Sequence, residues 1–168
     1  VLTAVGTVGV NISSLLALIG AAGLAVGLAL KDSLSNFAAG VMIIVFRPFK
    51  LGDSITASGQ SGIVDEIGIF STHLNTADNQ RIIIPNSAVI SGIIINATTL
   101  PQRRIDLIVS IGVDDSIGKV REVVTTVLAA DARILSAPAP MIGVDKLTAT
   151  TVDIFVRPWV QTGDYFAV

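Results

Sequence analysis

Apolar and small residues fill the first thirty positions of the chain, and the first charged side chains are Lys31 and Asp32. The stretch 12–30 is long enough for a membrane-spanning helix, which needs about 20 predominantly apolar residues. A buried helix of a soluble core is the alternative. A secretory signal peptide fits less well, because no basic region precedes the run and the run is too long.

A second apolar stretch, 34–46, follows the charged pair. Asp32 or Ser33 can cap a new helix, so the pattern predicts a bend between a spanning helix and an amphipathic one. A simple continuation of the first helix is the alternative. Arg47-Pro48 then ends the helical region, because the residue before a proline disfavours helical backbone.

Glycine and alanine make up half of the stretch 15–30. At 100° per residue, Leu24 and Leu28 lie one turn apart on one face. Two stripes of small residues flank this face, one of alanine and one of glycine. They consist of Ala21, Ala25 and Ala29 on one side and Gly20, Gly23 and Gly27 on the other.

Small residues at this spacing let helices approach closely within a membrane. Because the two stripes differ, alanines of one copy can fit the glycine groove of the next, and such a head-to-tail contact can close into a ring. Leu24 and Leu28 would then face the lumen as two rings about 6 Å apart. Narrow apolar constrictions gate pores by dewetting. A helix dimer or one helix of a monomeric bundle remains the alternative.

Short strands and turns replace the helical pattern from Phe49 onward. Five short strands are expected over about fifty residues, one of them over 67–76, which suits a small barrel. After a boundary near Pro101 the order is β-α-β-β, with strands 104–112, 141–144 and 151–160. Asp115 or Ser116 caps the helix. Its expected apolar face holds Ile117, Val120, Val124, Val127 and Leu128.

The composition narrows the function classes further. Charged residues make up 14% of the chain, against about 25% in average soluble proteins, and acidic residues outnumber basic ones, 13 to 11. Disorder is therefore excluded, and nucleic-acid binding is disfavoured. Cysteine is absent and His73 is the single histidine, so no metal site, catalytic constellation or cofactor is expected. The chain is not expected to be an enzyme.

Three motifs, GAAGLAVGLALKDSLSNFAAGV, FRPFKLGD and IIIPNSAVISGIIIN, resemble the small-conductance mechanosensitive channel (MscS) family. The resemblance covers essentially the whole chain. It implies an α+β membrane protein and a homoheptamer that opens under membrane tension and passes ions and small solutes. It also implies three domains: pore helix and bent second helix over 1–47, an Sm-like β-domain over 48–98, and a truncated ferredoxin-like domain over 99–168. The family's first two spanning helices and its last helix and strand are expected outside this sequence.

Individual positions take their expected roles from the same resemblance. Leu24 and Leu28 match the pore-sealing leucines, and the alanine and glycine stripes match the surfaces that slide between subunits. Gly40 matches a kink glycine. Lys31-Asp32 stands where the family's best-known sequence has Gln-Gly, so the hinge at Asp32 departs from the family pattern. In seven copies this pair would place alternating charge at the pore mouth.

Arg47 and Lys50 stand where the pore helices meet the body, and we expect them to pair with acids of the N-terminal loop or with lipid headgroups. With Lys31 they favour a cytoplasmic body below a plasma-membrane (in bacteria, inner-membrane) span. The expected function is a pore-forming subunit that opens under tension during hypoosmotic shock, with membrane lipids and identical subunits as partners. A membrane-anchored oligomeric scaffold without conduction is the alternative.

Overall fold

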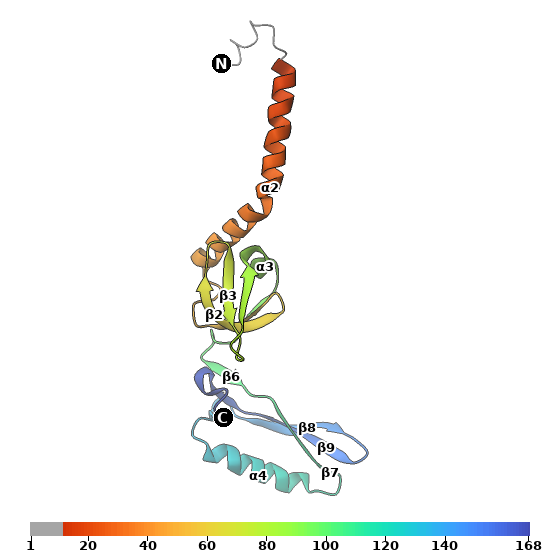
Figure 1. Cartoon of the computed structure of the whole chain (residues 1–168). Coiled ribbons are helices and arrows are strands. Elements are labelled where there is room, and N and C mark those ends of the chain that lie inside the picture. Colours follow the sequence, from red (N-terminus) through yellow and green to blue (C-terminus); the bar gives the residue numbers. More distant parts are fainter. Residues whose placement is uncertain (1–11) are drawn as a thin grey trace. The chain divides into compact units, whose positions relative to one another are not determined.

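The structure is a computed structural model that describes residues 12–168, so the first eleven residues of the predicted pore-helix domain lie outside the described part. The chain divides into two compact units, Val1–Asn96 and Ala97–Val168 (Figure 1). The apolar helix and the first β-rich part belong to the same unit.

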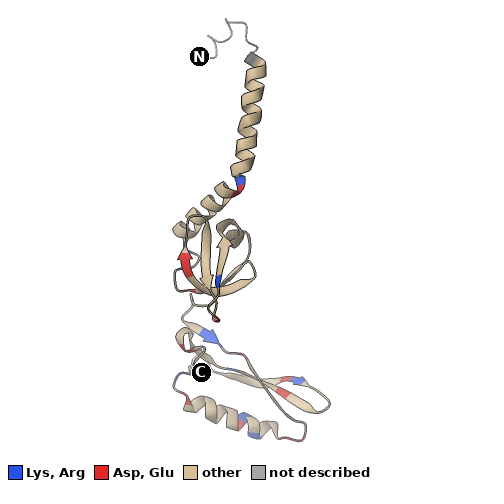
Figure 2. Ribbon diagram, in the orientation of Figure 1, with Lys and Arg blue, Asp and Glu red and all other residues tan. Residues whose placement is uncertain are grey.

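A single continuous helix, α2 (Ile12–Phe46), covers both predicted helical stretches. The predicted interruption and new cap at Asp32 or Ser33 are therefore wrong, and the continuation is correct. The axis nevertheless bends where the helix carries its charged residues (Figure 2). The side chain of Asn36 donates a hydrogen bond of 2.9 Å to the backbone oxygen of Asp32 one turn earlier, a contact that commonly accompanies helix bending.

The helix ends where the sequence predicted. The backbone N–H of Arg47 still donates to the oxygen of Ile43 at 2.9 Å, but Arg47 itself adopts a positive φ of 48°. A left-handed residue followed by Pro48 cannot continue an α-helix, so the chain turns into the β-domain at this point.

Five antiparallel strands follow α2 and form one sheet in the order β4-β3-β2-β1-β5. A register shift in β2 between Val64 and Glu66 marks a bulge. The strand expected over 67–76 begins only at Ser71 and ends at Asn75, and the short helix α3 was not predicted. The elements are β1 (Ser54–Ala57), β2 (Gln60–Ile67), β3 (Ser71–Asn75), β4 (Arg81–Pro85), α3 (Asn86–Ser91) and β5 (Ile94–Asn96).

The core of this unit joins the helix to the sheet. Ile43 from α2 and Phe49 from the following turn are both 1% exposed and pack with the inward residues of the strands. Alternation along β1 and β3 places every second side chain in the core, as expected for a sheet with one buried face. The remaining core residues are Ile55, Ala57, Val64, Leu74, Ile84 and Val89.

The second unit is a three-stranded antiparallel sheet in the order β7-β9-β8, with one helix packed on it, and a separate two-stranded ribbon of β6 and β10. Val152, Ile154 and Val156 of the central strand form its buried core. The elements are β6 (Gln102–Arg104), β7 (Leu107–Gly112), α4 (Ile117–Ala130), β8 (Met141–Leu147), β9 (Thr151–Arg157), β10 (Trp159–Gln161) and the 3₁₀ turn η1 (Thr162–Asp164).

Two predicted strands of this unit are split. The strand predicted over 104–112 is divided between β6 and β7, and the one over 151–160 breaks at Pro158, whose missing N–H removes a ladder hydrogen bond. The predicted helix face is correct for the residues that pack on the sheet, Val120, Val124 and Leu128. Ile117 and Val127 instead are 41% and 64% exposed and do not pack against this core.

The start of α4 follows the sequence signal. Ser116 is the N-cap, and its hydroxyl oxygen accepts a hydrogen bond of 3.4 Å from the backbone N–H of Lys119. At the other end, Asp131 is the C-cap residue, and its carboxylate binds Arg133 through Nε at 2.9 Å and Nη2 at 2.5 Å. The same guanidinium donates to the oxygen of Ala167 at 2.6 Å, which ties the loop after α4 to the last residues.

The hydrogen bond from the Arg133 side chain lowers the pKa of Asp131 from 3.8 to about 2. Because this pKa is depressed, the stabilising contribution of the charged carboxylate is present above pH 3.8 and is lost as the pH falls toward 2. Arg133→Gln should return the pKa of Asp131 toward its ordinary value, measured by NMR titration of the aspartate carboxyl carbons. Lys119→Gln is the control, and an unchanged midpoint in the Arg133 variant would contradict this assignment.

Candidate functional site

The helix α2 is long and apolar enough to cross a membrane: residues Ser13–Phe46 have a mean hydropathy of 2.1 in their most apolar window, and none of that window is buried. Its 35 residues extend about 50 Å at 1.5 Å each, more than the hydrocarbon core of a bilayer. A core helix of a soluble protein would be covered by its own chain. This exposure therefore favours a membrane or other copies of the chain as its surroundings.

The predicted gate and packing residues all lie on this uncovered part. Leu24 and Leu28 are 65% and 64% exposed. A Cβ built on Gly20, Gly23 or Gly27 would find no atom within 4 Å, so these grooves are empty within the chain. The alanines of the opposite stripe are exposed as well. The structure thus places both stripes and both leucines on one helix and gives none of them a partner within the described part of the chain.

Gly40 has a different environment, because it lies where α2 rests on the β-domain. A methyl group at this position would overlap the backbone oxygen of Ile69 and would lie 2.6 Å from Nδ2 of Asn86. The absence of a side chain is what allows the helix to approach the sheet this closely. The predicted hinge role of Gly40 stays a prediction, and the structure adds a packing reason for glycine here.

Two asparagines complete this contact, and neither was predicted from the sequence. Oδ1 of Asn36 accepts hydrogen bonds from the backbone N–H of Ser87 at 3.0 Å and from its hydroxyl at 2.8 Å. It thereby satisfies an N–H in the first turn of α3, where Pro85 provides no side-chain cap. The available signal was an amide side chain in a helix of mostly apolar residues, but its partner lies 51 residues away in the sequence.

Asn86 is fully buried and holds the turn between β2 and β3. Its Nδ2 donates to the backbone oxygens of Gly68 and Ile69 at 3.0 Å each, and its Oδ1 accepts from the hydroxyl of Thr72 at 2.9 Å. Buried polar groups stabilise a fold only when they are paired in this way. Asn36, Gly40, Ile43, Asn86 and Ser87 together form what we call the helix seat.

Arg47 and Lys50 lie just after the helix and line a groove of about 500 Å³. The rest of the groove consists of apolar side chains, among them Ile43 and Phe49, and one acid, Glu66. Neither basic side chain forms an ion pair within residues 12–168 as described. Their predicted partners, acids of an N-terminal loop or lipid headgroups, therefore stay predictions.

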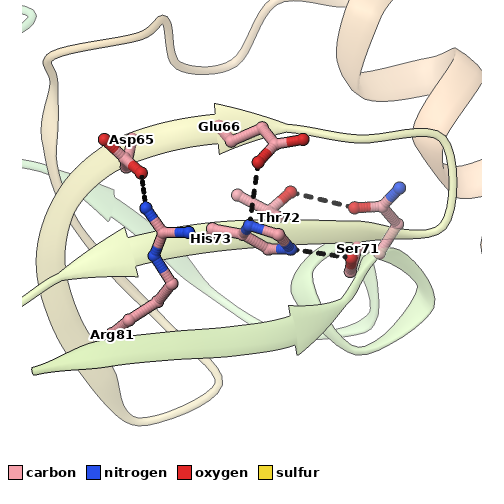
Figure 3. A network of polar contacts seen from close by, with 7 residues as sticks. Asp65, Glu66, Ser71, Thr72, His73 and Arg81 are labelled. Carbon is pink, nitrogen blue, oxygen red and sulfur yellow. Dashed lines mark hydrogen bonds and ion pairs between the residues drawn. The ribbon is translucent and has the colours of Figure 1, made fainter.

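His73 is a strand residue, as expected, and lies on β3 opposite Glu66 of β2. Its Nδ1 lies 3.1 Å from Oε2 of Glu66 and its Nε2 lies 3.2 Å from Oγ of Ser71 (Figure 3). Arg81 pairs with Asp65 beside it at 2.5 Å. Among the described residues no group of three acidic, histidine or cysteine side chains is placed to hold a metal ion.

Comparison with known proteins gives matches over nearly the whole chain. Residues 32–99 match the mechanosensitive ion channel β-domain, and residues 105–168 match the C-terminal domain of the mechanosensitive ion channel MscS. A small-conductance mechanosensitive channel of Edwardsiella ictaluri is 48% identical over 88% of this chain and 52% of its own length. An uncharacterized MscS family protein of Synechocystis is 42% identical over 94% of this chain and 53% of its own length.

Solved structures agree with these matches. The crystal structure of Helicobacter pylori MscS in a closed state has a TM-score of 0.89 and 32% identity, covering 97% of this chain and 64% of that one. Arabidopsis thaliana MSL1 has a TM-score of 0.78 and 25% identity, covering 91% of this chain and 56% of that one. The chain spans about half the length of the curated relatives it matches.

The helix seat yields a test of its packing. Gly40→Ala should lower the stability of the protein by about 1–3 kcal/mol, because the added methyl overlaps the Ile69 carbonyl and the helix must move away. The measurement is the thermal unfolding midpoint of the full-length protein in detergent. Gly92→Ala is the matched control, since a Cβ there meets nothing within 4 Å. Equal midpoints for the two variants would contradict the seat.

Proposed function

The chain belongs to the MscS family of mechanosensitive ion channels, and we propose that it is a pore-forming subunit opened by membrane tension, releasing ions and small solutes during hypoosmotic shock. The observation that carries this proposal is the exposed face of α2. Leu24 and Leu28 lie there between two unlike small-residue stripes, and none of these residues has a partner within the described chain.

The stripes support a head-to-tail ring of identical subunits. Alanine methyls of one copy fill the glycine grooves of the next, which restores the packing that the isolated helix lacks. Such a heterologous contact closes into a ring when the rotation between neighbouring copies is a whole fraction of a full turn. The family resemblance favours seven copies. Gly20, Gly23 and Gly27 each cost about 1 kcal/mol relative to alanine in a helix, and close intersubunit packing offsets that cost.

Leu24 and Leu28 form the gate in this arrangement. Two leucine rings about 6 Å apart make a narrow apolar passage. Water and ions leave such a passage because its walls offer no polar groups to bind them. Tension favours whichever state occupies more membrane area, so opening requires only that the open ring be wider. Smooth stripes without large side chains let the helices slide past one another, and Asp32 and Gly40 are the proposed hinges.

The remaining assignments follow from this arrangement. Lys31 lies at the pore mouth, Arg47 and Lys50 couple the body to lipids or to lipid-facing helices, and residues 48–98 and 99–168 form the cytoplasmic β-domain and α+β domain. The predicted location is the plasma membrane, which in a bacterium is the inner membrane, with more than one span in the whole protein. No cofactor takes part in this mechanism.

The gate assignment is tested in the full-length protein, reconstituted in liposomes and examined by patch clamp. Leu24→Ser should wet the constriction, so the channel should open at lower tension than the wild type. Val26→Ser is the matched control, because Val26 is 58% exposed on the opposite face of the same helix. Normal closure of the Leu24 variant would contradict the assignment of Leu24 as a gate residue. The absence of tension-activated current in the wild type would favour a non-conducting scaffold.

The coupling role of Arg47 is tested by reversing its charge. Arg47→Glu should raise the tension threshold, because the groove would repel the acidic groups that transmit force to the pore helix. Lys119→Glu, an exposed position on α4 of the other unit, is the control for a general effect of charge. A threshold equal to that of the wild type in patch recordings would count against coupling.

A further inference from the structure

Lys31 and Asp32 are the only charged residues of α2, and both are exposed. Consecutive residues on a helix do not face each other, so this lysine and aspartate cannot neutralise one another within one copy. Neither side chain takes part in an ion pair or hydrogen bond among the described residues 12–168; the bond to Asp32 uses its backbone oxygen. Two opposite charges thus stand side by side on an apolar helix without a partner in the described part of their own chain.

Their positions on the helix follow from its continuity. Because α2 runs unbroken through this point, the angular phase of the two stripes continues to it. Lys31 follows Gly23 and Gly27 at four-residue spacing, and steps of about 40° bring it to the edge of the glycine stripe next to the leucine face. Asp32 follows Leu24 and Leu28 at the same spacing, and each step of four turns it by about 40° toward the alanine side.

We propose that Lys31 of each subunit forms an ion pair with Asp32 of its neighbour, giving a closed belt of ion pairs directly below the leucine gate. This rests on the proposed head-to-tail ring. In that ring the glycine stripe of one copy lies against the alanine side of the next, so the long side chain of Lys31, at the leucine-side edge of the glycine stripe, faces the neighbour's side that carries Asp32. The binding partner of these two side chains is a second copy of the chain, because that copy supplies the opposite charge to each of them.

The belt removes repulsion between like charges around the pore axis. Unpaired rings of lysine or of aspartate would each repel themselves around the axis, at a place where apolar surroundings weaken screening. Alternating pairs remove that repulsion and add a directional contact to the smooth packing of the stripes. Asp32 lies about 6 Å beyond Leu28 along the helix, so the pairs hold the subunits together at the level next to the constriction. They stabilise the arrangement in which the gate is narrow.

The first test compares four full-length proteins by patch clamp in liposomes: the wild type, Lys31→Asp, Asp32→Lys and the double exchange of both residues. Each single variant places like charges across every contact, so its tension threshold should fall. The double exchange restores opposite charges with the order reversed, so its threshold should return to the wild-type value. Unchanged thresholds in the single variants, or a double exchange no better than they are, would overturn the belt.

The second test does not depend on conduction. The 168 residues contain no cysteine, so Lys31→Cys and Asp32→Cys together provide one reactive pair per contact once any cysteines elsewhere in the full-length protein are replaced. A short bismaleimide should produce a ladder of covalent oligomers larger than the dimer in denaturing gels, and each single-cysteine variant should stop at the dimer. No ladder overturns the proposed contact. A ladder from a protein that passes no tension-activated current keeps the contact and rejects the channel function.

Discussion

The contact between the lower half of α2 and the β-domain is the constraint on which the rest of this structure depends. Before this contact, residues 16–35 of the helix are all exposed. At the seat, Ile43 is buried in the core of the sheet, Gly40 permits a close approach, and Asn36 binds the first turn of α3. These contacts fix the rotation of the helix, and rotation decides which residues face any common axis.

The same contact joins two regions that would otherwise be independent. Burial of Ile43 and Phe49 removes large apolar side chains from water, which contributes about 1.5–3 kcal/mol for each. The hydrogen bonds of Asn36 and Asn86 add direction to this apolar contact, because each has defined partners on a different loop or helix. A shift of the β-domain must therefore move the lower half of the helix with it. A shift of this half of the helix must likewise move the β-domain.

Local patterns predicted what depends on neighbouring residues and missed what depends on distant ones. The phase of the stripes, the end of α2 at Arg47-Pro48 and the cap at Ser116 are local, and the structure has the last two as predicted. The continuity of α2 was missed because Asp32 and Ser33 resemble caps, although a residue able to cap also fits the interior when its side chain is solvated. The contact of Asn36 with Ser87 has no local signature at all.

The positions of the bend and of the seat also separate the two proposed hinges on physical grounds. Flexing at Gly40 moves a residue packed against the Ile69 carbonyl and breaks contacts in a buried, hydrogen-bonded region. Flexing at Asp32 moves a residue whose side chain has no partner in the described part of its own chain, one turn before the first contact of the seat. The axis of the helix already bends there (Figure 2). A change of helix direction at Asp32 thus leaves the seat intact, whereas one at Gly40 requires the helix to leave it.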